Sequence, residues 1–82
     1  MNMESHLIKA VVDMAVFLEY TNSEFLNEDA AVEAMEQLAA ELQQMGESDQ
    51  QQLSKQIVIL SSLFGQPQKD FVAGLPDALG LG

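Results

Sequence analysis

The chain has 82 residues, a formal net charge of −10 at pH 7 and no cysteine. This length makes a single domain, close to the lower limit at which a core is stable alone, and the lack of cysteine excludes disulfides and thiolate metal sites. Nucleic acids and anionic membranes attract Lys and Arg, of which the chain has three in all, so neither is expected as a partner. A protein with a basic surface is the complementary choice.

The first apolar stretch is too short for a membrane span or an export signal. Its longest unbroken apolar run is Met14–Leu18, whereas a span needs about 20 such residues. Lys9 and Asp13 interrupt the stretch, and no basic segment comes before it. The expected location is the cytoplasm.

Apolar residues at steps of three and four predict a first helix over Glu4–Tyr20. Its main stripe, which Ile8 and Ala15 widen, comprises Leu7, Val11, Met14 and Leu18. On the polar side, Lys9 and Asp13 are spaced to form an ion pair four residues apart.

The outer side of this helix ends in three apolar residues, Val16, Phe17 and Tyr20. Either a later segment folds over them, or they contact a partner or a second copy of the chain. Exposed apolar patches usually mark interfaces, and aromatic residues are typical interface anchors. We therefore take these residues as a candidate partner or dimer contact.

The second predicted helix, Asn27–Gly46, is the one around which the domain is organised. Asn27 is a suitable N-cap, acidic residues occupy the first turn, and Gly46 offers a left-handed stop. The short connector before it predicts an antiparallel hairpin with the first helix, with Phe25 as a plug at the open end. The inner face comprises Ala31, Met35, Leu38, Leu42 and Met45.

The opposite face of this helix is acidic and contains no Lys or Arg. It comprises Asp29, Glu33, Glu36, Ala40, Gln43 and Glu47. Each pair of neighbouring like charges, such as Glu33 and Glu36, costs roughly 0.2–0.5 kcal/mol on an isolated helix. The face is either kept charged for solubility or is an acidic recognition stripe. The candidate partner-binding residues are its acidic members, Asp29, Glu33, Glu36 and Glu47.

Ser48 followed by Gln51 is a capping-box pattern, which predicts a third helix over Asp49–Phe64. Its inner stripe comprises Leu53, Ile57, Leu60 and Phe64. Val58 and Ile59 lie on the other side, and we expect the C-terminal tail to cover them.

The tail from Gln66 to Gly82 predicts a short fourth helix, with Pro67 in its first turn and Gly74 at its end. Asp77–Leu79 adds one more turn. Because the tail is rich in Phe, Val and Leu, we expect it to lie across the third or the first helix. The chain, residues 1–82, is thus predicted to be a single all-α domain, a small antiparallel bundle of three main helices plus a short C-terminal helix.

Motifs for catalysis, metals and cofactors do not occur in the sequence. The one histidine, His6, lies on the polar side of the first helix, and no serine lies in a nucleophile elbow. Glu-x-x-His pairs, calcium loops and Gly-rich phosphate loops are missing. Asp29, Glu33 and Glu36 on one convex helix would make a poor metal cage. We predict no enzymatic activity and no cofactor.

Acyl carrier proteins are also acidic helical domains of about this length, with a modified serine in an Asp-Ser-Leu-type motif that opens a helix. The candidate serines here read Asn22-Ser23-Glu24 and Glu47-Ser48-Asp49. Neither has the preceding Asp or the following apolar residue, so the chain is not expected to be a carrier.

In its length, all-helical pattern, lack of cysteine and acidic helix face, the chain resembles the small immunity proteins encoded beside bacterial antagonistic toxins. The resemblance covers the whole chain and rests on its general character. It implies tight one-to-one binding of a cognate toxin, by blocking its active site or an essential surface.

Our hypothesis is therefore a non-enzymatic protein-binding module, most specifically an immunity-type inhibitor that neutralises a basic toxin or effector. The alternative is a homodimeric structural adaptor or a small subunit of a larger assembly. In that case Val16, Phe17 and Tyr20 would mediate self-association.

Overall fold

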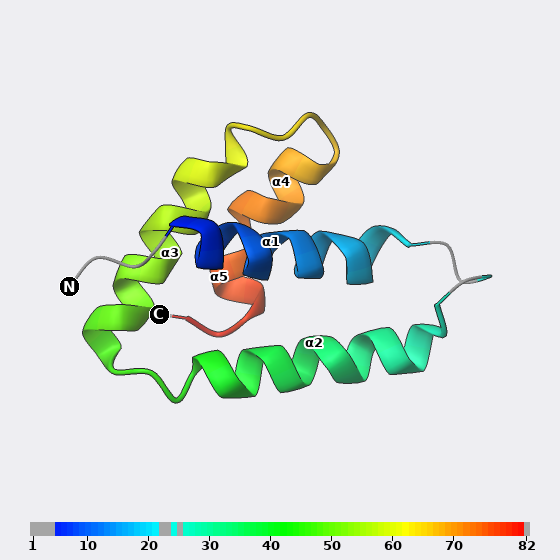
Figure 1. Cartoon of the computed structure of the whole chain (residues 1–82), viewed down its shortest axis with the longest axis horizontal. Coiled ribbons are helices and arrows are strands. Elements are labelled where there is room, and N and C mark those ends of the chain that lie inside the picture. The colour runs from blue at the N-terminus through cyan, green and yellow to red at the C-terminus, as the bar shows by residue number, and fades with distance from the viewer. Residues whose placement is uncertain (1–4, 22–23, 25, 82) are drawn as a thin grey trace.

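The computed structural model describes residues 5–21, 24 and 26–81, and this part of the chain is helical throughout apart from its turns. The helices are α1 (Ser5–Tyr20), α2 (Glu28–Leu42), α3 (Glu47–Ser61), α4 (Gln68–Ala73) and α5 (Leu75–Ala78). Figure 1 shows α1 beside α2, with α3 at one end of the pair and α4 and α5 returning along α3. The predicted all-α class is confirmed.

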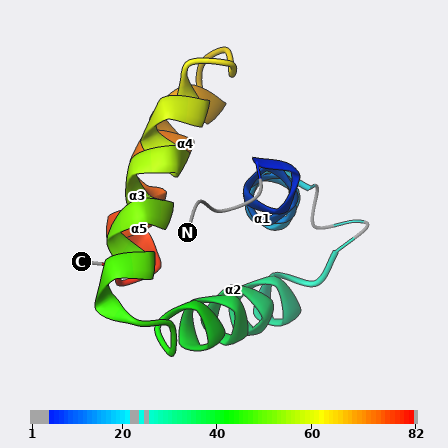
Figure 2. The ribbon, with the colours of Figure 1, turned by 60° about the vertical axis from the view of Figure 1, so that its left-hand side comes forward.

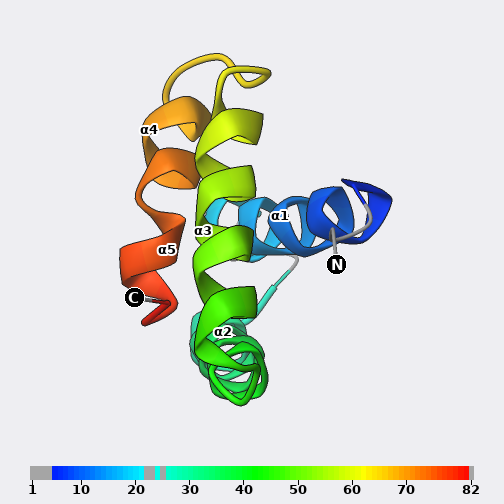
Figure 3. The ribbon, with the colours of Figure 1, turned by 90° about the vertical axis from the view of Figure 1, so that its left-hand side faces the viewer.

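Among the three main helices, only the first two have the predicted antiparallel relation. The start of α1 lies by the end of α2 and the end of α1 by the start of α2, so the two run in opposite directions (Figure 1). In contrast, α3 crosses α1 (Figures 2 and 3). An antiparallel bundle in sequence order is not confirmed, because α3 packs against α4, α5 and α1 rather than along α2.

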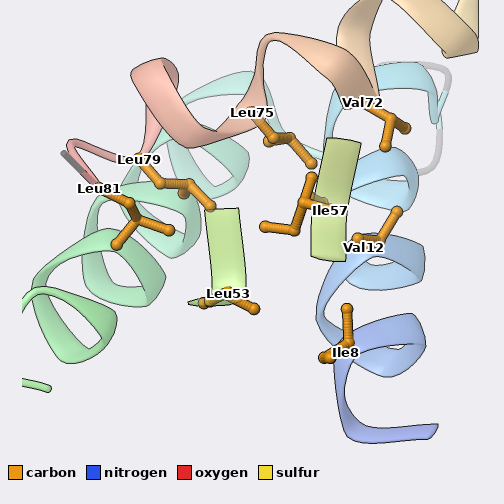
Figure 4. Close-up of a cluster of buried hydrophobic side chains, with 9 residues drawn as sticks. Ile8, Val12, Leu53, Ile57, Val72, Leu75, Leu79 and Leu81 are labelled. Carbon is orange, nitrogen blue, oxygen red and sulfur yellow. The ribbon is translucent and has the colours of Figure 1, made fainter. Parts of the chain in front are cut away.

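The core lies where α3 meets α1 and the C-terminal segment. Its buried apolar residues are Ile8, Val12, Ala15, Leu53, Ile57, Val72, Leu75, Leu79 and Leu81. Figure 4 shows Leu75 and Val72 of the C-terminal segment and Val12 of α1 gathered around Ile57 of α3. The expectation that the tail lies across α3 or α1 is confirmed, and the tail supplies much of the core.

The buried side of α1 differs from the predicted one. Ile8, Val12 and Ala15 are buried, whereas Leu7 and Met14 of the expected stripe are 66% and 54% exposed. α1 is apolar around most of its circumference, so its periodicity does not choose one side. The contact with α3 and α4 decides which side is buried. The buried residues are each one position later in the sequence than the predicted ones.

The predicted N-cap of α2 is confirmed, as is the ion pair on α1. Asn27 Oδ1 accepts hydrogen bonds from the backbone N–H groups of Asp29 (2.8 Å) and Ala30 (3.1 Å). Lys9 Nζ lies 2.8 Å from a carboxylate oxygen of Asp13. The plug proposed at Phe25 falls outside the described residues.

The predicted end of α2 is wrong. The helix stops at Leu42, and Gly46 has φ −57°, so it provides no left-handed stop. The connector after the helix is instead held by a side chain, because Gln50 Nε2 donates to the backbone oxygens of Gln43 (2.9 Å) and Met45 (2.8 Å). The Gln43 side chain in turn donates to the Leu79 carbonyl oxygen at 2.7 Å and ties this corner to the tail.

Helix α3 begins at Glu47 with Gly46 as its N-cap, so Ser48 lies inside the helix and the predicted capping box is wrong. The inner stripe is confirmed, with Leu53 and Ile57 buried. The tail does not cover Val58 and Ile59, which remain 49% and 64% exposed. This expectation is wrong because α4 and α5 pack on the side that carries Ile57.

Candidate protein-binding surface

The acidic residues predicted to form one stripe divide between two helices. Asp29, Glu33 and Glu36 lie on α2 and are exposed. Glu47 is also exposed, but it lies in the first turn of α3 because α2 ends at Leu42. We call the three carboxylates of Asp29, Glu33 and Glu36 the acidic row. Glu47 is not continuous with it.

No lysine contacts the acidic row in the part of the chain that the structure describes. Glu33 accepts a long hydrogen bond from Gln37 Nε2, at 3.4 Å. Lys9 is held by its own neighbour on α1, and the other two lysines lie on α3 and α4. No lysine of the described residues therefore offsets the charge of the acidic row.

The predicted apolar contact is partly used inside the chain. Val16 is half-buried against the core. Tyr20 packs edge-to-face on Phe71 of α4, with ring centroids 5.6 Å apart, and its hydroxyl donates to the Pro67 carbonyl oxygen at 3.4 Å. Phe17 remains 49% exposed. Helix α4 thus folds over one side of this patch and leaves Phe17 at the surface.

Part of the acidic row lies beside an apolar surface that sequence analysis did not propose. Where the end of α1 meets the start of α2, two adjoining hollows have volumes of about 310 and 250 Å³. They share Leu18, Glu19, Ala31 and Val32. We call this surface the α1–α2 groove, defined by Leu18, Glu19, Glu28, Ala31, Val32, Met35 and Glu36.

The α1–α2 groove combines an apolar floor with acidic margins. Its floor contains half-buried Leu18 and Met35 together with Val32, which is 57% exposed. Exposed glutamates flank it, one on α1 and two on α2. Sequence reasoning missed the groove because Val32 lies outside the inner stripe of α2. The available signal was the four-residue spacing of Val32 and Glu36, which puts them on one side of the helix.

Two other hollows are less suited to a charged partner. One, of about 400 Å³, lies between α1, the end of α2 and α3, and its lining comprises Leu7, Ile8, Ala10, Val11, Leu42, Met45 and Leu53. The other, of about 570 Å³, lies between α3 and the tail, where Val58 and Ile59 are exposed beside Lys55 and Asp77. The first has no charged lining residue, and the second has one of each sign.

The described residues contain no group of three His, Asp or Glu side chains that could hold a metal ion. His6, the sequence's one histidine, is exposed on α1. None of the described helices has the length and apolar character needed to cross a membrane. The α1–α2 groove, in contrast, offers a partner both apolar contacts and negative charge.

No protein-family model, curated protein or solved structure matches this chain.

Proposed function

We propose that this chain is a non-enzymatic protein-binding module whose partner presents a basic surface. The observation that carries the proposal is the acidic row, which no described lysine neutralises and which adjoins the apolar floor of the α1–α2 groove. Charge of one sign speeds the encounter with a partner of the opposite sign, and apolar contacts supply most of the affinity.

The stability cost of the acidic row supports this proposal. Glu33 has a like charge four residues before it and another three residues after it, and each such pair destabilises a helix by roughly 0.2–0.5 kcal/mol. A Lys at either neighbouring position would instead stabilise α2. A partner that supplies the opposite charge removes this cost.

The burial of α2 gives further support. None of its 15 residues is buried, although seven apolar residues of α2 and its C-terminal turn are half-buried, namely Ala31, Ala34, Met35, Leu38, Ala39, Leu42 and Met45. Incompletely covered apolar faces are typical of surfaces that bind another protein. Phe17 of α1 adds an aromatic contact at the surface.

The test begins with capture of a partner by the immobilised full-length chain from the cells that make it, followed by mass spectrometry. The association rate is then measured for wild type and for Glu33→Lys/Glu36→Lys at low and moderate salt. We expect the double variant to associate at least about tenfold more slowly at low salt, with the gap closing as salt increases.

A matched control changes the same amount of charge elsewhere. Asp70→Lys/Asp77→Lys alters two exposed carboxylates of α4 and α5, and its association rate should remain within about twofold of wild type. If reversal of Glu33 and Glu36 leaves the rate unchanged, the acidic row has no part in the mechanism.

The narrower form of the proposal is an immunity-type inhibitor that acts in the cytoplasm against a toxin or effector. It is supported by the resemblance in length, acidity and helical pattern. The captured partner should be toxic when produced alone and harmless when produced together with this chain. A harmless partner would restrict the proposal to a binding module of another kind.

A homodimeric adaptor is the second candidate, favoured by the exposure of Leu7, Met14 and Phe17 along α1. Light scattering separates the two, because only the adaptor requires a wild-type dimer that Phe17→Glu converts to a monomer. A wild-type monomer at micromolar concentration would eliminate it.

A further inference from the structure

We infer that the α1–α2 groove is where the partner docks, and that the docking element is a short amphipathic helix whose aliphatic side chains are flanked by Lys or Arg. This inference rests on the proposed function and deepens it, because it names the segment that is recognised and the surface that recognises it.

The shape of the groove suits a helical segment. Along α2 it extends from Glu28 to Glu36, which at 1.5 Å per residue is about 12 Å, or roughly two helical turns. An amphipathic helix commonly binds by laying its apolar side between two helices of the receptor. In such a segment, two aliphatic residues one turn apart would both reach the floor.

The floor of the groove can accept these side chains. Val32 is 57% exposed and Leu18 and Met35 are half-buried, so each has apolar surface that a partner would remove from water. Met35 adds adaptability, because its unbranched thioether side chain adjusts to different neighbours. The contact area between an aliphatic anchor and this floor is the source of affinity.

The margins of the groove determine the charge of the segment. Glu19 stands on α1, and Glu28 and Glu36 stand on α2. Lys and Arg side chains lay their methylene groups on apolar surfaces and keep the charged end in water. A Lys or Arg next to the anchor would therefore cover part of the floor and pair with a carboxylate at its edge.

A second copy of this chain does not have the required charge. Its three lysines, Lys9, Lys55 and Lys69, lie on three different helices, and α2 contains none. None of these helices offers a basic face, and two copies meeting here would bring carboxylates together, which opposes association. The occupant that matches both the floor and the margins is a basic segment of another protein.

The test uses a synthetic 14-residue helical peptide of Leu and Lys, with an oligolysine of equal charge for comparison. Each is titrated into the isotope-labelled full-length chain and followed by NMR. We expect the Leu/Lys peptide to bind at least about tenfold more tightly than oligolysine, since only it can fill the apolar floor. The largest shifts should fall on the amides of Leu18, Val32 and Glu36.

Two substitutions in the groove should weaken the peptide, and two matched substitutions should not. Val32→Asn and Glu36→Gln should each raise the Kd by about fivefold or more. Val58→Asn alters an exposed valine of α3, and Glu41→Gln alters an exposed glutamate of α2 outside the groove. Both controls should remain within about twofold of wild type.

The inference is overturned if oligolysine binds as tightly as the Leu/Lys peptide, if the shifts map to α3 and the tail, or if Val32→Asn has no effect. The captured natural partner separates this failure from failure of the proposed function. If Glu33→Lys/Glu36→Lys weakens binding of this partner but Val32→Asn does not, the groove is excluded as the docking site and the proposed function is retained. If neither change affects binding, both the docking site and the proposed function are excluded.

Discussion

Helices α2 and α3 both have 15 residues and an apolar stripe, yet three residues of α3 are buried and none of α2 is. The difference lies in what packs against them. α3 is covered by α1, α4 and α5, whereas α2 packs mainly against α1. The core that holds the domain together is therefore centred on α3 and the tail.

This division assigns the two helices different tasks. Side chains of α3 such as Ile57 gain their stabilisation within the chain, because it removes them from water completely. The apolar side chains of α2 are covered only in part. Contact with another molecule would therefore remove more of their surface from water than it would for Ile57. Changes to the two helices and to the tail therefore test this division, and the largest effect is expected from loss of the tail that covers α3.

Deleting Leu75–Gly82 should abolish the folded state. The deletion removes Leu75, Leu79 and Leu81, each at most 1% exposed, and loss of a buried leucine side chain typically costs about 2–5 kcal/mol. The sum is comparable to the whole stability of a small domain, about 5–15 kcal/mol. Circular dichroism and thermal melting should show an unfolded chain. A cooperative transition at the wild-type temperature would show that the core does not depend on the tail.

Ile57→Ala in α3 should destabilise the domain more than Leu38→Ala in α2. Ile57 is fully buried, which predicts a loss of about 2–5 kcal/mol. Leu38 is half-buried, so its loss should be about 1 kcal/mol. Urea titration with a common slope measures both. Equal losses would mean that α2 is as much a part of the core as α3.

Gly80→Ala should be destabilising and Gly65→Ala should not. Gly80 has φ +71°, where an L-residue pays about 1–2 kcal/mol, and a Cβ there would lie 2.5 Å from Gln43 Nε2. A Cβ on Gly65 meets nothing within 4 Å, so that change should be neutral or stabilising by about 0.4–1 kcal/mol. Thermal melting compares the two. Similar melting temperatures would exclude a constraint at Gly80.

Glu33→Gln should have the smallest effect on folding, and in the favourable direction. The change removes the repulsion between Glu33 and the like-charged residues next to it on α2, so it should stabilise the fold by about 0.2–0.5 kcal/mol. Asp13→Asn is the matched change of opposite sign, because it removes the pairing with Lys9 on α1 and should cost about 0.3–0.5 kcal/mol. Urea titration at low salt measures both, and high salt should reduce both. Destabilisation by Glu33→Gln would mean that this carboxylate stabilises the fold.

The features that local chemistry determines were predictable from the sequence. The all-α class follows from periodicity, the start of α2 from the side chain of Asn27, and the packing of the tail from its apolar residues. Features that depend on tertiary contacts were not. α1 has apolar residues on more than one side, and only the contact with α3 and α4 decides that Val12 rather than Met14 is buried.

The candidate surface was predictable only in part, for the same reason. The exposure of Asp29, Glu33 and Glu36 follows from their position opposite the inner stripe of α2. The α1–α2 groove does not, because it requires Leu18 of one helix to lie beside Val32 of the next. The placement of Glu47 depends on where α2 ends, and the connector that follows this end is held by Gln50, whose side chain bonds to carbonyls five and seven residues before it.

The hydrogen bond from Gln43 to the Leu79 carbonyl oxygen has a mechanical consequence for recognition. It fastens the corner where α2 meets α3 to the C-terminal tail. Val32 lies eleven residues from Gln43, about 16 Å along the helix axis. The α1–α2 groove therefore lies at the end of α2 remote from this fastening, and none of the fully buried core residues lines it. A substitution such as Val32→Asn can thus alter recognition without loosening the anchorage of α2.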